Sequence, residues 1–265
     1  MDGLRAEYVP GRPHPALARY VLRYVGYREH SAVPVRRRQA PVGSCTLILG
    51  LGPSLRLFGP AGPSVPVSFL AGMHDAPVIT EFTGAQHGVQ VDLSPLGVFA
   101  LLGRPMRDLT NAVPTLDELE EPALARLAAR LTDDPGWSQR FARLDAVLLR
   151  RLDESRVRPD PEITHAWHRL RATSGAVGVR QLADETGWSR RHLLTRFQHQ
   201  VGLAPKQAAR VLRFERAAEL LVSPAGEGAI TDVAAACGYA DHAHLAREFR
   251  ALAGCTPTQY RAEQS

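Results

Sequence analysis

The sequence contains one pattern twice, first as VRQLADETGWSRRHLLTRFQHQVGLAP (Val179 to Pro205) and again as ITDVAAACGYADHAHLAREFRALAGCTP (Ile230 to Pro257). Matching positions are 51 residues apart before the turn that follows the central glycine, and 52 apart after it, because the second copy has one extra residue there. A pattern that repeats in this way indicates one structural unit built twice. The matched pairs are Leu182 and Val233, Ala183 and Ala234, Gly187 and Gly238, Leu193 and Leu245, Phe197 and Phe249, Gly202 and Gly254, and Pro205 and Pro257.

Each copy has the parts of a helix-turn-helix. A short first helix carries a small alanine where two helices must cross closely, and Gly187 or Gly238 then allows a turn with positive φ. An aromatic residue follows at the corner. Ser189 or Asp241 then caps a second helix, because its side-chain oxygen accepts a hydrogen bond from a free backbone N–H. We expect this second helix to read DNA.

The exposed face of that second helix supplies the candidate base contacts. In the first copy Arg191, Leu194, Thr195 and Gln198 lie opposite the apolar residues, and arginine suits guanine, glutamine suits adenine, and leucine and threonine suit the thymine methyl group. In the second copy the face presents His242, Ala243, His244, Ala246 and Arg247. Because it is less basic, we expect weaker or more water-mediated reading there.

The stretch from Arg190 to Arg216 holds seven basic residues and one acidic residue, Glu215. Lysine and arginine neutralise DNA phosphates, so this stretch is a candidate phosphate-facing strip. We expect phosphate contacts from Ser189, Arg190, Arg196 and Lys206.

The N-terminal part has a different pattern. Up to about residue 95, short β-prone runs alternate with glycine and proline, which predicts a small sheet or barrel over 45–51, 55–58, 65–70, 78–82 and 88–93. Helical spacing then begins at Pro95, and the segment Ser155 to Pro161 has the composition of a linker. The sequence therefore predicts an α+β chain with a mixed N-terminal domain over 1–157 and an all-helical domain over 158–265, in which a long central helix joins the two helix-turn-helix units.

The last helix predicted for the N-terminal domain runs from Trp137 to about Glu154. Its apolar residues are spaced like a short coiled coil, so it could meet its copy in a dimer. Two heptads fall short of the usual length, and we favour packing on its own domain. The basic run Arg36 to Arg38 reads as a solvated loop rather than an effector site.

Several function classes lack support. The net charge of +5 is too mild to indicate nucleic acid by itself, and Cys45, Cys237 and Cys255 match neither a disulfide framework nor a zinc site. His30, His74 and His87 lack ligand spacing. We expect no catalytic residues, no metal, no cofactor and no membrane span, and a cytoplasmic protein.

The C-terminal half resembles the AraC/XylS family of bacterial transcription regulators. The resemblance is carried by LADETGWSRRHLLTRF, then RFERAAELL, then VAAACGYADHAHLAREFRALAGCTPTQYR, in the family's order. It implies two helix-turn-helix units held by a central helix over about Pro205 to Val222, with base-facing positions at Arg191, Leu194 and Thr195 and at His242, Ala243, His244 and Arg247. The two readers would enter major-groove segments about 34 Å apart.

The N-terminal half resembles, more loosely, the sensor domains of such regulators. The resemblance implies a domain that binds a small effector, dimerises, or both, and RNA polymerase as a further partner if the protein is an activator. Double-stranded DNA is the main expected partner. The alternative from another class is an enzyme whose β-rich N-terminal domain does chemistry while the helical part targets DNA.

Overall fold

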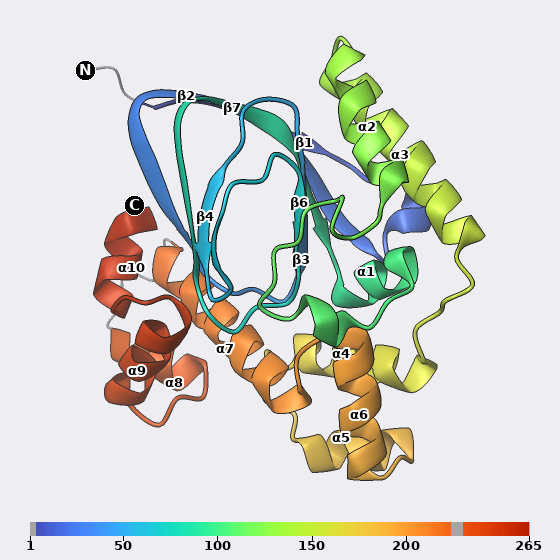
Figure 1. The fold of residues 1–265 in the computed structure, drawn as a ribbon. Helices are drawn as coiled ribbons and strands as arrows, with labels where there is room; N and C mark the ends of the chain where they lie inside the picture. The colour runs from blue at the N-terminus through green and yellow to red at the C-terminus, as the bar shows by residue number, and fades with distance from the viewer. Residues whose placement is uncertain (1–3, 224–229, 265) are drawn as a thin grey trace.

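The computed structural model describes residues 4–223 and 230–264, and Figure 1 shows a twisted sheet with helices around it. The strands are β1 (Arg5–Gly11), β2 (Val21–Gln39), β3 (Cys45–Gly50), β4 (Arg56–Gly59), β5 (Gly62–Ser64), β6 (Phe69–Ala71) and β7 (Val78–Leu93). They pair antiparallel in the order β1-β2-β7-β3-β6, with β4 pairing β5 and β7. The predicted N-terminal sheet is confirmed.

The two long strands differ from the expectation. The runs predicted at 78–82 and 88–93 form a single strand, β7, which continues through Gly84 at φ +78°. Its partner β2 was not predicted as a strand, because it contains Pro34 and the run Arg36 to Arg38. The pairing shifts register between Ser31 and Val35, so the proline falls where the regular ladder is interrupted.

The helices of the N-terminal part follow the sheet. They are α1 (Pro95–Leu102), α2 (Pro122–Asp133) and α3 (Trp137–Glu154), with short 3₁₀ turns η1 (Pro15–Leu17) and η2 (Met106–Leu109). In Figure 1, α2 and α3 lie side by side at one end of the sheet. The predicted helix from Trp137 to Glu154 is confirmed.

The aromatic side chains of α3 pack within their own chain. Phe141 stacks on Tyr24 with ring centroids 5.8 Å apart, and it lies so close to Gly11 that a Cβ there would be 2.7 Å from its ring. Trp137 covers Gly26 in the same way. Two glycines thus make room for two rings, and the interpretation that α3 packs on its own domain is confirmed.

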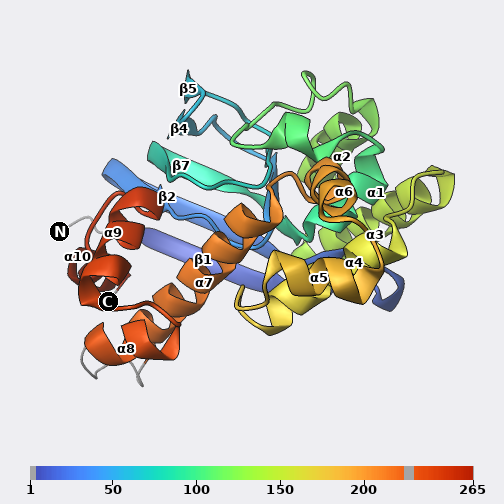
Figure 2. The same ribbon diagram turned by 90° about the horizontal axis from the view of Figure 1, so that it is seen from below.

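The remaining helices are α4 (Pro161–Ala172), α5 (Val179–Thr186), α6 (Arg190–Val201), α7 (Pro205–Val222), α8 (Ile230–Ala236), α9 (His242–Leu252) and α10 (Pro257–Gln264). Figure 2 shows α7 crossing below the sheet, with α4 to α6 near one end of it and α8 to α10 near the other. The predicted all-helical C-terminal domain with a long central helix is confirmed. No helix or strand occupies 155–160.

The two parts share one continuous apolar core, which includes Leu47 and Val91 of the sheet and Phe197 and Phe214 of the helices. The backbone of one residue, Gly43, is held by two helices of the C-terminal part. The N–H of Gly43, in the loop before β3, donates to the carboxylate of Glu215 on α7 at 3.0 Å, and its carbonyl accepts from Arg171 on α4 at 3.2 Å. The helical units are therefore fixed against the sheet rather than tethered to it.

Candidate nucleic-acid interface and an internal cavity

The first helix-turn-helix, unit 1 (residues 179–201), has the local structure that its sequence predicts. Gly187 ends α5 with φ +69°, in the left-handed region that glycine adopts without strain. The hydroxyl of Ser189 then accepts from the backbone N–H of His192 at 3.3 Å and caps α6. The turn and the cap therefore set the direction of α6.

Helix α6 has one buried face and one exposed face. Leu193 and Phe197 are fully buried in the core. The expected base-facing residues are on the surface, and Leu194 keeps 39% of its area exposed. The exposed set expected to contact bases or phosphates comprises Ser189, Arg190, Arg191, Leu194, Thr195 and Gln198. These six residues present a continuous polar surface around one leucine.

Arg196 differs from its neighbours. Its Nε and Nη2 donate to the two carboxylate oxygens of Asp160, at 2.7 and 2.8 Å. Asp160 directly precedes α4, but its side chain makes no capping bond there. This ion pair connects α6 to the start of α4. The guanidinium of Arg196 is therefore engaged by Asp160 and is not available for the phosphate contact expected from the sequence.

The second helix-turn-helix, unit 2 (residues 230–252), repeats this construction. Gly238 has φ +72°, and the carboxylate of Asp241 accepts from the N–H of His244 at 2.6 Å. On α9, His242, Ala243 and Arg247 are exposed. This exposed face is shorter and less basic than that of α6.

Two residues of α9 depart from the expected reading face. Ala246 is only 9% exposed and belongs to the packed face, so its assignment to the exposed face is wrong. His244 is half-buried, with its ring edge-on to Tyr239 at 5.2 Å, and its Nδ1 accepts from the N–H of Ala240 at 3.4 Å. This imidazole therefore supports the turn.

The basic stretch before and along α7 is only partly available to phosphates. Lys206 is exposed in the first turn of α7. Arg210 instead pairs with Glu248 of α9 at 2.7 Å, and Arg213 lies over the ring of Tyr239 at 5.9 Å. The number of basic residues in the sequence overestimates the phosphate-facing strip, because side chains that are distant in sequence pair with some of its arginines.

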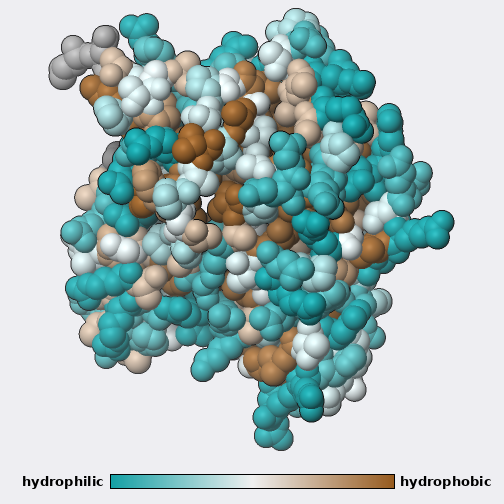
Figure 3. All heavy atoms as spheres, viewed as in Figure 1, coloured by the Kyte–Doolittle hydropathy of each residue, from teal (hydrophilic) through white to brown (hydrophobic). Residues whose placement is uncertain are grey.

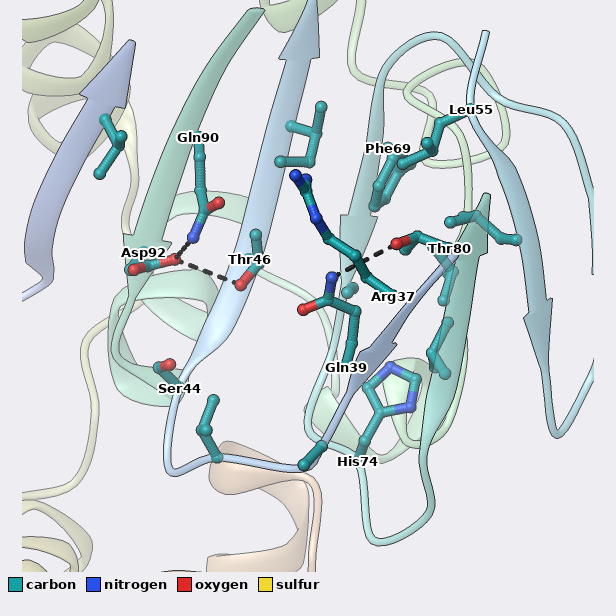
Figure 4. Close-up of a pocket in the computed structure, with 18 of the residues that line it drawn as sticks. Arg37, Gln39, Ser44, Thr46, Leu55, Phe69, His74, Thr80, Gln90 and Asp92 are labelled. Carbon is teal, nitrogen blue, oxygen red and sulfur yellow. Dashed lines mark hydrogen bonds between the residues drawn. The ribbon is translucent and has the colours of Figure 1, made fainter. Parts of the chain in front are cut away.

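A cavity of about 570 Å³ lies between the sheet and α7. In Figure 3 the molecule is hollowed there, and hydrophobic residues surround the opening. Figure 4 shows apolar side chains such as Phe69 and Leu55 on one side and polar side chains from β2, β3 and β7 on the other. Its size and mixed lining are typical of a small-molecule site.

Two ion pairs lie on the polar side of this cavity. Arg37 pairs with the buried carboxylate of Glu29 at 2.7 Å, and Arg23 pairs with Asp92. Asp92 also accepts from Gln90 at 2.8 Å, as drawn in Figure 4. The expectation that Arg36 to Arg38 form a solvated loop is wrong, because all three lie in β2. The alternation of inward-facing and outward-facing residues along this segment could have indicated a strand from the sequence.

His74 lies in the same cavity. It is 8% exposed, and neither ring nitrogen makes a hydrogen bond of normal geometry among the described residues, although the backbone of Ala112 lies near the ring. Burial lowers its pKa, which favours the neutral ring. Figure 4 shows the imidazole pointing into the cavity.

Two features are absent from residues 4–223 and 230–264. No group of three or more histidine, cysteine or carboxylate side chains there is arranged to hold a metal ion. No helix within the same ranges is long and apolar enough to cross a membrane.

Two family models match the chain. A helix-turn-helix domain matches residues 182–263, and a domain of unknown function, DUF6597, matches residues 11–115. The xylose operon regulatory protein of Escherichia coli strain K12 is 31% identical over 117 residues, which is 43% of this chain. The chain spans 29% of the length of that relative.

Solved structures match over the whole chain. ToxT from Vibrio cholerae O395 has a TM-score of 0.51 at 8% identity and covers 99% of this chain and 98% of its own. ToxT bound to (E)-4-(8-methylnaphthalen-1-yl)but-3-enoic acid has a TM-score of 0.51 at 11% identity, with 99% coverage of both chains. At this identity the likeness shows the fold. Together with the family match and the repeated motif, it leads to one conclusion: residues 182–263 of this chain form a helix-turn-helix domain, within a fold that is similar to that of ToxT.

Proposed function

We propose that the protein is a sequence-specific DNA-binding regulator of transcription. The observation that carries this proposal is the pairing of two capped reader helices, α6 and α9, each buried on one face and exposed on the other, at the two ends of α7. A helix presented in this way fits the major groove, and two such helices on one rigid support fit successive turns of one duplex.

The roles of the individual residues follow from their exposure. Arg191, Leu194, Thr195 and Gln198 of α6 read bases, and His242, Ala243 and Arg247 of α9 read a second segment. Ser189, Arg190 and Lys206 bind phosphates, since they lie at helix N-termini or in the first turn, where backbone N–H groups and the helix dipole also favour anions. His244 contributes through the shape of its turn.

We further propose that a small effector controls this activity through the cavity under the sheet. The cavity has the size of a ligand site, and a protein with the same fold, ToxT, has been solved with a small molecule bound. Dimerisation and contact with RNA polymerase in an activator remain proposals that rest on the family. We place the protein in the cytoplasm, where bacterial DNA lies.

The DNA-binding proposal is tested by selecting bound sequences from a random duplex library with the full-length protein and measuring affinities for the selected site. Arg191→Ala should weaken specific binding by about 1–3 kcal/mol and leave nonspecific binding nearly unchanged. Lys206→Ala should weaken both kinds of binding and reduce the salt dependence by about one unit of slope.

The matched control is Arg150→Ala, which removes an exposed arginine on α3 and should change neither kind of binding. Failure to enrich any sequence, or an equal loss from Arg191→Ala and Arg150→Ala, would overturn the proposal. The matched proteins are regulators, and none of these comparisons favours the alternative of an enzyme.

A further inference from the structure

The cavity under the sheet has an uneven balance of charge. Its lining includes two arginines and four carboxylates. Both arginines are occupied, because Arg37 pairs with Glu29 and Arg23 pairs with Asp92. The other two carboxylates belong to Glu215 and Glu219, and both come from α7. The polar part of the cavity that is left for a ligand is therefore acidic.

The two carboxylates of α7 have little cationic compensation. Glu215 accepts a neutral N–H from Gly43, and burial raises its pKa. Arg171 lies near enough to Glu215 for its charge to oppose part of this rise in pKa, but it donates to the carbonyl of Gly43 and does not line the cavity. The Oε2 of Glu219 lies 3.6 Å from the Nη1 of Arg216, and both of those side chains are at least half exposed. Such an exposed pair contributes little.

A second, independent feature points to a ligand in this cavity. His74 is buried, its ring nitrogens make no hydrogen bond of normal geometry although the backbone of Ala112 lies near, and its imidazole points into the cavity. An unsatisfied buried polar group costs about 1–3 kcal/mol, which a bound molecule with a polar group would recover. The facing apolar wall, which includes Leu55, Leu57 and Phe69, requires that the same molecule also have a hydrophobic body.

We propose that this cavity binds an amphipathic amine, with its apolar body against the Leu55 and Phe69 wall and its ammonium group at Glu215 and Glu219 of α7. This proposal rests on the proposed regulatory function and specifies the effector class. An ammonium is a strong hydrogen-bond donor, and a carboxylate that accepts from it forms a charge-assisted bond. A carboxylate ligand would instead face two like charges and no unpaired arginine.

The position of the site also connects the ligand to the DNA-binding units. Glu215 holds the Gly43 loop at 3.0 Å, and α7 joins unit 1 to unit 2. An ammonium at Glu215 competes with the N–H of Gly43 for the same carboxylate. Amine binding therefore alters the contact between the sheet and the helix that supports both readers, and coupling between the two sites must be reciprocal.

The test is isothermal titration of the full-length protein with three probes of one shape: phenylbutylamine, phenylbutanol and phenylbutyrate. The amine should bind most tightly and the carboxylate most weakly. Glu215→Gln should weaken amine binding by about tenfold and Glu219→Gln, whose side chain is more exposed, by a smaller factor, and both should leave the alcohol unchanged, because each removes one charge-assisted contact and keeps the shape. Glu154→Gln, an equal change of charge on α3, should have no effect.

DNA binding by the same preparations is measured in parallel. If the amine fails to bind, or if the carboxylate binds as tightly as the amine, this inference is overturned even when DNA binding is intact. If DNA binding itself is absent, the proposed function fails, whichever probe binds. Amine binding that responds to Glu154→Gln as strongly as to Glu219→Gln would also overturn the inference, since it would reflect overall charge.

Discussion

Units 1 and 2 each have a glycine turn, a side-chain N-cap and a packed phenylalanine, but the turn of unit 2 is one residue longer and the two units are attached to the rest of the molecule differently. The end of α6 packs on α1 and η2, with His199 edge-on to Phe99 at 5.5 Å and the Gly202 carbonyl bound by Thr110 at 3.0 Å. Unit 2 meets the sheet mainly through Arg38, which donates to the Ala253 carbonyl at 2.6 Å. Unit 1 packs directly on the helices of the N-terminal domain, whereas unit 2 packs on α7 through Phe249 and Phe214 and has a polar contact with the sheet through Arg38.

The two units also differ in the residues that they expose. Unit 1 presents Arg190, Arg191 and Gln198, which suit direct contacts with phosphates and base edges. Unit 2 presents His242, Ala243 and Arg247. A fixed unit that reads strongly and a second unit that adjusts would allow one duplex to be bound in two steps. The difference in attachment between units 1 and 2 can be tested by substitutions at equivalent positions.

The largest expected effect comes from truncating the matched core phenylalanines. Phe197→Ala and Phe249→Ala should each destabilise the native state by about 3–5 kcal/mol, because both rings are fully buried. Phe197 packs near Trp167, and its helix also packs on α1 of the N-terminal domain through His199 and Phe99, so its loss should lower the midpoint of a single urea transition. Phe249→Ala should open residues 230–264 first, as followed by hydrogen exchange. Equal exchange across the chain in both variants would refute the comparison.

A smaller effect is expected at the polar attachment of unit 2. Arg38→Met keeps the aliphatic part of the side chain but removes its bonds to the Ala253 carbonyl and to Glu263, the latter at 3.2 Å. Hydrogen bonds of charged groups contribute about 1.5–3 kcal/mol, so exchange should accelerate in unit 2 and stay unchanged in unit 1. Arg36→Met, in the same strand and exposed, is the control. Acceleration in unit 1 as well would show that the attachment is shared.

The smallest effect concerns Glu185 on α5, whose equivalent in unit 2 is Ala236. Hydrogen bonds from Arg169 and His165 lower the pKa of Glu185 to about 2. A carboxylate with a lowered folded-state pKa stabilises the protein above its ordinary pKa and loses that contribution as pH falls towards 2. The difference in urea midpoint between wild type and Glu185→Gln should therefore be present at pH 7 and shrink below about pH 4.5. A constant difference down to pH 3 would contradict it.

The sequence predicts the C-terminal domain far better than the sheet. Gly187 and Gly238, with Ser189 and Asp241 after them, specify local backbone geometry, and local geometry is sufficient to place a helix-turn-helix. Strand β2 is stabilised mainly by partners far away in sequence. Its Pro34 and three consecutive arginines resemble a loop until β7 is known to lie beside it.

For the candidate DNA-contacting residues, too, the sequence predicts what local structure determines and misses what depends on the tertiary fold. The exposure of Arg191 and Thr195 follows from helical periodicity alone. The pairing of Arg196 with Asp160 and of Arg210 with Glu248 does not, since the partners are separated by 36 and 38 residues and meet only through the tertiary fold. The cavity could not be predicted either, because its lining comes from several strands and α7 together.

The two hydrogen bonds to the backbone of Gly43 limit how the N-terminal and C-terminal parts of such proteins can be exchanged. Its N–H is held by α7 and its carbonyl by α4, and a Cβ on this glycine would come within 2.5 Å of Leu212. A chimera that joins the N-terminal half of this chain to the C-terminal half of a related protein without Glu215 and Arg171 would keep the linker but lose both of these bonds. Exchange of modules should therefore succeed only when the Gly43 loop and its two helical partners are transplanted as a set.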